Sequence, residues 1–137
     1  MSLSRLLSLF AVATALVAAP RAEAGSPRHE CFSSYKPSRV LPYEIERASD
    51  YEIHTMDKIL AGAHVFIPAE PALTAEWLRA QLDRRVSQAT AESECPLDVR
   101  GVSVSVQSGG PGFWVTIAAG DRKSAEEVLR RAQRVVR

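Results

Sequence analysis

The chain has 137 residues, of which 46% are hydrophobic and 24% are charged, and its formal net charge at pH 7 is +1. A chain of this length is enough for one compact domain. The near-neutral charge argues against nucleic acid and against an anionic membrane surface as the main partner, because proteins that bind either one usually carry a net basic surface.

Residues 1–24 predict a secretory signal peptide. Arg5 precedes the uncharged, mostly apolar run Leu6–Ala19, which is short for a bilayer span, and Ala22-Glu23-Ala24 places small residues at both cleavage-site positions. An uncleaved N-terminal anchor is the alternative. Cleavage would leave residues 25–137 as a single domain of 113 residues, with 15 basic and 15 acidic side chains. Arg outnumbers Lys 14 to 3, which is typical of a GC-rich bacterial coding sequence. We therefore expect a small exported bacterial protein, periplasmic or secreted, with no membrane insertion after signal cleavage.

The two cysteines, Cys31 and Cys95, both follow the predicted signal peptide. In an oxidising compartment an even pair is most simply a disulfide, which here would close a loop of about 65 residues. Free thiols are one alternative. A metal site using His29 beside Cys31 is another, although two Cys and scattered His do not form a recognised ligand spacing.

Residues 25–62 are interpreted as an irregular N-terminal arm that Cys31 ties to the body. Prolines and serines interrupt any sustained periodicity in this segment. Near its end, Ser49-x-x-Glu52 has the form of a capping box, and apolar residues at helical spacing predict a short helix that ends at Gly62. The alternation of Tyr51, Ile53 and Thr55 would instead favour a strand.

The next two predicted elements are a strand and a helix. Ala63–Pro68 (AHVFIP) is a short β-branched and aromatic run closed by proline, which predicts a strand. Thr74 is expected to cap a long amphipathic helix, with Arg79 and Asp83 paired on its solvated side. Its apolar stripe comprises Trp77, Leu78, Leu82, Val86 and Ala89.

The C-terminal third predicts a hairpin and a second helix. Val102, Val104 and Val106 alternate with polar residues, and Phe113, Val115 and Ile117 alternate with Trp114 and Thr116. The intervening SGGPG, residues 108–112, predicts the turn of an antiparallel hairpin. Ser124-x-x-Glu127 then predicts the start of a helix that reaches the C-terminus.

From residue 63 the predicted order is strand, helix, strand, strand, helix. This is a ferredoxin-like split βαβ pattern without its last strand. We therefore expect an α+β fold, in which a small antiparallel sheet carries two helices on one face. The arm over residues 25–62 is free to supply an extra strand or to lie across the other face of the sheet.

The sequence offers little support for catalysis. The glycines of SGGPG could cradle an anion, but they lead into a strand rather than a helix, and Pro111 lacks an N–H donor. There is no Gly-x-Ser-x-Gly motif, and bridged cysteines cannot act as nucleophiles. We therefore expect no catalytic residues and no cofactor. His54 and Met56 form a weak alternative copper site.

Strand alternation predicts a different kind of site. If Val65 and Ile67 point toward the helices, the neighbouring residues in each strand point away from them. Large aromatic surfaces among small polar groups are typical of a ligand or partner surface. The candidate binding residues on this open face are His64, Phe66, Trp114, Ser103, Ser105 and Thr116. The opposing hypothesis is that residues 25–62 cover this face and leave no site there.

These observations predict a non-catalytic extracytoplasmic binding or interaction module whose partner is an unknown protein or small molecule. The alternative from another class is a small secreted enzyme or a protein that handles copper or zinc.

Overall fold

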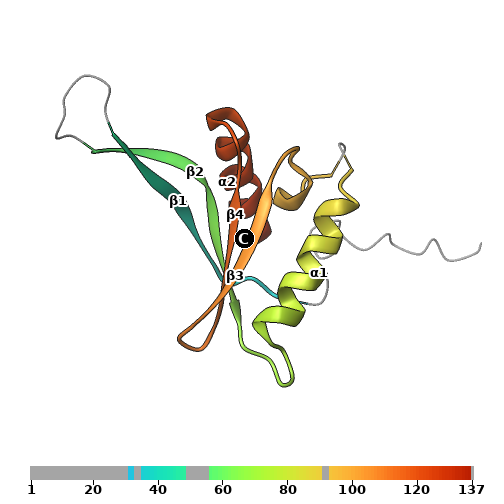
Figure 1. Cartoon of the computed structure of the whole chain (residues 1–137). Helices are drawn as coiled ribbons and strands as arrows, with labels where there is room; N and C mark the ends of the chain where they lie inside the picture. Colours follow the sequence, from blue (N-terminus) through green and yellow to red (C-terminus); the bar gives the residue numbers. More distant parts are fainter. Residues whose placement is uncertain (1–30, 33–34, 49–55, 91–92, 137) are drawn as a thin grey trace, which may run out of the picture.

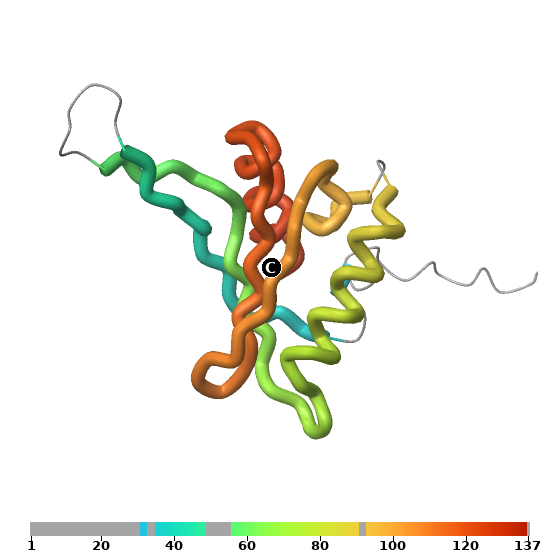
Figure 2. Tube along the Cα trace, in the orientation of Figure 1, coloured from blue at the N-terminus to red at the C-terminus, as the bar shows by residue number. Residues whose placement is uncertain are grey.

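The computed structural model describes residues 31–32, 35–48, 56–90 and 93–136 (Figures 1 and 2). The predicted signal peptide lies outside these residues. The described elements are the strands β1 (Arg39–Ala48), β2 (Met56–Pro68), β3 (Ser103–Gly109) and β4 (Gly112–Ala118), the helices α1 (Ala75–Ser87) and α2 (Arg122–Val136), and a short 3-10 helix, Pro96–Asp98. The fold is therefore α+β. Within the described part of the chain, neither helix is long and apolar enough to cross a membrane.

The four strands form one sheet in the order β1-β2-β4-β3, and every neighbouring pair is antiparallel. β2 and β3 both run antiparallel to β4, so they are parallel to each other, and α1 lies between them in the chain. The element order is thus β-β-α-β-β-α, with one more strand at the N-terminal side than the predicted order had.

The interpretation of residues 25–62 as an irregular arm is wrong for most of its described part. Residues 39–48 form β1, and residues 56–62 form the first half of β2 rather than the end of a short helix. β1 pairs with β2 from Arg39↔Phe66 to Ala48↔Met56. Non-local backbone pairing thus overrides the local helical spacing. Residues 49–55, with the predicted capping box, lie outside the described residues.

One face of the sheet packs against the helices and forms the core. The inward side chains of β2 from Ala61 onward and those of β4 are buried, and the core also contains Leu78 and Leu82 of α1 and Val128 of α2. α1 begins where predicted, because the backbone N–H of Trp77 donates to the hydroxyl of Thr74 at 3.2 Å. The placement of Trp77 on the buried stripe is wrong, since this side chain is 57% exposed.

α2 begins earlier than its capping-box motif predicted. Asp121 accepts hydrogen bonds from both the backbone N–H and the hydroxyl of Ser124, so Asp121 and not Ser124 caps the helix. Glu127 instead pairs with Arg130 and Arg131, whose hydrogen bonds lower the pKa of its carboxyl from 4.5 to about 2. Arg131 also donates to the carbonyls of Ser93 and Cys95, which ties α2 to the segment before the 3-10 helix.

The predicted disulfide is confirmed. Cys31 and Cys95 are bridged, with a Cα–Cα distance of 5.3 Å and a sequence separation of 64. Both cysteines are buried, as is the neighbouring Phe32. The bridge therefore holds the beginning of the described chain against the core.

Candidate functional site

The SGGPG segment forms a hairpin turn, as predicted. Gly109 of β3 pairs with Gly112 of β4, so the loop consists of Gly110 and Pro111 alone. Gly110 has a φ of 59°, which suits the first central position of a two-residue hairpin turn, where glycine is favoured. The turn sets the register in which Phe113, Val115 and Ile117 point into the core. Trp114 and Thr116 therefore point to the opposite face, which we call the open face.

Rows of side chains cross the open face from strand to strand. In the register of the sheet, one row consists of Arg39, Phe66, Trp114 and Gln107. The next row consists of Leu41, His64, Thr116 and Ser105. A third row begins at Tyr43 and ends at Ser103. Side chains directly opposite one another on adjacent strands lie within contact distance. The six predicted residues of the open face therefore do share one surface.

Aromatic rings connect the strands across this face. The ring centroids of Phe66 and Trp114 lie 5.0 Å apart, and those of Tyr43 and His64 lie 4.8 Å apart. A Cβ on Gly109 would lie 2.8 Å from Trp114 Cδ1, and one on Gly112 would lie 2.8 Å from Phe66 Cζ. The two rings thus rest against glycine backbone, and the glycines of the turn serve to seat them.

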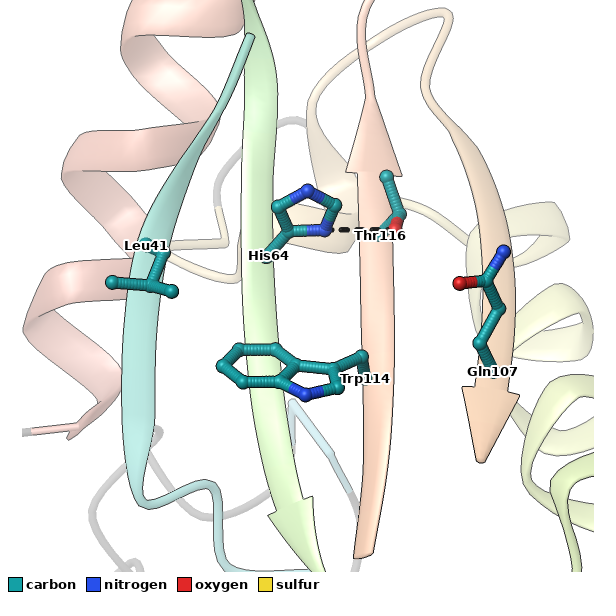
Figure 3. Close-up of a pocket in the computed structure, with 5 residues that line it drawn as sticks. All are labelled: Leu41, His64, Gln107, Trp114 and Thr116. Carbon is teal, nitrogen blue, oxygen red and sulfur yellow. Dashed lines mark hydrogen bonds between the residues drawn. The ribbon is translucent and has the colours of Figure 1, made fainter. Parts of the chain in front are cut away.

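His64 occupies the middle of the face. Its Nδ1 lies 2.9 Å from the hydroxyl of Thr116 (Figure 3). Its ring makes edge contacts with the rings of Tyr43 and Trp114. Burial among these neighbours lowers the pKa of His64 below 6.5. The imidazole is therefore mostly neutral at pH 7, and it offers hydrogen bonds rather than a charge.

The lowered pKa of His64 predicts that the fold loses stability on acidification. Below pH 6.5 the unfolded chain takes up a proton at this position before the folded protein does, so the free energy of unfolding falls until the folded pKa is passed. Urea unfolding at pH 7.5 and pH 5.5 should show this loss, and His64→Gln should reduce it. His29 and His54 are unchanged in the variant, so the difference isolates His64. Equal pH dependence in both proteins would contradict this assignment.

Two shallow hollows flank the indole of Trp114 on the open face. One, of about 230 Å³, is shown in Figure 3, where Trp114 reaches from β4 across β2; its lining residues are Leu41, His64, Gln107, Trp114 and Thr116. The other, of about 440 Å³, is lined by Arg39, Phe66, Gly109, Gly110, Pro111 and Trp114. Ser103 and Ser105 are exposed on the same face but line neither hollow.

Residues 39–48 do not lie over the open face; they extend it. β1 lies beside β2 at the edge of the sheet, and it contributes Arg39, Leu41 and Tyr43 to the surface. The sequence prediction missed all three residues. The signal was present, because Leu41, Tyr43 and Ile45 alternate with Pro42, Glu44 and Glu46 in the period of a strand.

The described residues add no support to the two metal-site hypotheses. His29 and His54 lie outside the described residues, and Met56 is a 59% exposed residue at the start of β2. Cys31 is in the disulfide. In the described ranges, no group of three or more His, Cys, Asp and Glu side chains could hold a metal ion.

Comparisons with protein-family models, with curated proteins and with solved structures found no match. The geometry of the open face is therefore the feature that bears on function.

Proposed function

We propose that the chain is a non-catalytic, extracytoplasmic binding or interaction module that acts through the open face. The observation that carries the proposal is the partly exposed aromatic surface of Tyr43, His64, Phe66 and Trp114, on the side of the sheet opposite the helices. Beside it, Leu41 is 45% exposed. Aromatic side chains offer a large contact area and lose little conformational entropy on binding, so a partly exposed cluster of them favours a recognition surface.

The partner is a protein or a small molecule rather than a nucleic acid. Arg39 is the one side chain with a permanent positive charge among the residues that line the two hollows. Recognition of nucleic acid usually requires several cationic contacts to phosphates, which the lining of these hollows lacks. Aromatic side chains can also stack on nucleic-acid bases. The near-zero net charge of the chain favours a different ligand.

Export is part of the proposal. The Cys31–Cys95 bridge is compatible with an oxidising extracytoplasmic compartment, where disulfides persist. The signal peptide over residues 1–24, the bacterial origin and the choice between periplasm and medium stay predictions from the sequence. A secreted enzyme or a protein that handles copper or zinc stays the alternative, and no contact among the described residues favours it.

We also infer that the architecture is a variant of the ferredoxin-like arrangement. Two parallel strands, β2 and β3, that flank an antiparallel strand and are joined through α1 support a split βαβ unit. In this interpretation β1 takes the place beside β2 that a last strand would otherwise occupy. The extra strand widens the face on which the proposed site lies.

Site-specific photocrosslinking in the producing cell tests the proposed function. A photoreactive amino acid at Gln107, which is exposed on the open face, should yield a covalent adduct with the partner. The matched control is the same amino acid at Gln133, which is exposed on α2. The adduct from position 107 should be absent at position 133 and lost in a Trp114→Ser background. The same adducts from both positions, or none from position 107, would count against the open face.

A further inference from the structure

The larger hollow on the open face has an apolar floor. Phe66 and Trp114 lie side by side there, with their rings tilted by 56° and their centroids 5.0 Å apart. Gly109, Gly110 and Pro111 of the hairpin turn complete its wall. A volume of about 440 Å³ falls in the range of sites for small organic ligands. The two rings offer apolar contact area that suits a planar aromatic group.

Charge distinguishes one end of this hollow. Arg39 lies directly opposite Phe66 in the sheet register, at the start of the row that continues to Trp114. The other lining residues of both hollows carry no formal charge, apart from His64, which is mostly neutral at pH 7 because burial lowers its pKa. Arg39 has no salt-bridge partner among the described residues, whereas several other arginines of the chain do.

We propose that the larger hollow binds a small planar aromatic molecule that carries a single carboxylate. The ring would lie against Phe66 and Trp114, and the carboxylate would accept hydrogen bonds from the guanidinium of Arg39. A guanidinium can hold a carboxylate through two parallel hydrogen bonds, which makes it selective for the anion over the neutral amide of the same shape. This inference rests on the proposed function, because it names the ligand class for the same face.

The test compares indole-3-acetate with indole-3-acetamide, which differ chiefly in the charge of one group. Each is titrated into the ¹⁵N-labelled protein, and the indole N–H signals of Trp114 and Trp77 are followed by NMR. The acid should shift the Trp114 signal in a saturable way and bind about tenfold more tightly than the amide. Raising the NaCl concentration should weaken the binding of the acid, because salt screens an exposed ion pair. The affinity for the amide should not change.

Two arginine variants locate the charge. Arg39→Gln should reduce the affinity for the acid to that for the amide. Arg100→Gln is the matched control, since Arg100 is also exposed but lines neither hollow. The affinity of the Arg100→Gln variant for the acid should equal that of the unchanged protein. Both substitutions are at exposed positions, so neither result depends on a change in the core.

The outcomes separate the two proposals. Equal affinity for acid and amide, with saturable shifts at Trp114, would overturn the carboxylate inference and leave the open face as a binding surface. Shifts confined to Trp77 would also overturn it, since Trp77 lies outside this face. If neither probe binds at up to 10 mM (about 3 kcal/mol of standard binding free energy), the aromatic carboxylate is excluded. The crosslinking result at Gln107 still decides the proposed function in that case.

Discussion

Removing the Cys31–Cys95 bridge is expected to lower the free energy of unfolding by about 4 kcal/mol, as the chain-entropy estimate gives for a loop of this length. The cause is mainly the unfolded chain, which gains freedom once the loop is open. The native contacts add to the effect, because the buried Phe32 follows Cys31 directly and loses its tether to the core. Marginal stability of small domains makes this a large share of the total.

Urea unfolding of the oxidised protein, of the reduced protein and of the Cys31→Ala/Cys95→Ala variant measures the effect. Reduction changes no side chain other than the two cysteines, so it controls for the cavities that alanine leaves behind. Reduced and double-variant proteins should both unfold at much lower urea concentration than the oxidised protein. A loss below about 1 kcal/mol in the reduced protein would contradict the prediction, because the estimate for the closed loop is several times larger.

Local sequence predicted the part of the open face that lies on β2, β3 and β4, because each of these strands shows its own alternation of apolar and polar residues. SGGPG joins two runs of strict alternation, so the outward direction of Trp114 followed from the sequence itself. His64 and Phe66 followed in the same way from the inward direction of Val65 and Ile67. Each of these predictions needed only one strand, because side chains along a strand point alternately to its two faces.

The other half of the face depends on which strands pair. Met56–Leu60 has helical spacing of apolar residues, but these residues hydrogen-bond to β1, a partner that local sequence does not identify. Pro42 within β1 made a strand look less favourable, yet proline is tolerated at a sheet edge, which is where β1 lies. Leu41 and Tyr43 were therefore missed although their alternation is plain.

Trp77 shows the limit of assigning a helix face by hydrophobicity alone. Leu78 and Leu82 are one turn apart and face the sheet. Trp77 precedes Leu78 by one residue, which rotates it by about 100° around the helix axis. It lines instead a third shallow hollow, together with Tyr35, Pro71 and Leu73. An aromatic residue next to a buried position therefore need not be buried.

Gly62 is the position where a single methyl group should have the largest effect on the sheet. A Cβ at this residue would lie 1.9 Å from the carbonyl oxygen of Ile117 on β4, so the two strands could not keep their separation. The φ of Gly62 is 151°, a value that L side chains rarely adopt. The register between β1 and β2 shifts between Tyr43 and Glu44 of β1, and Tyr43 is the residue that pairs with Gly62. The tight contact and the irregular pairing thus occur at the same place.

Gly62→Ala is therefore expected to lower the free energy of unfolding by about 3 kcal/mol or more, from backbone overlap together with conformational strain. Gly101→Ala is the matched control, because Gly101 also has a positive φ, 76°, but a Cβ there would meet nothing within 4 Å. That substitution should cost only about 1 kcal/mol, the conformational part alone. Urea unfolding of both variants separates the two contributions. An equal loss of unfolding free energy in the two variants would contradict the prediction. It would show that β2 and β4 can move apart at this point and avoid the overlap with Ile117 at no cost in stability.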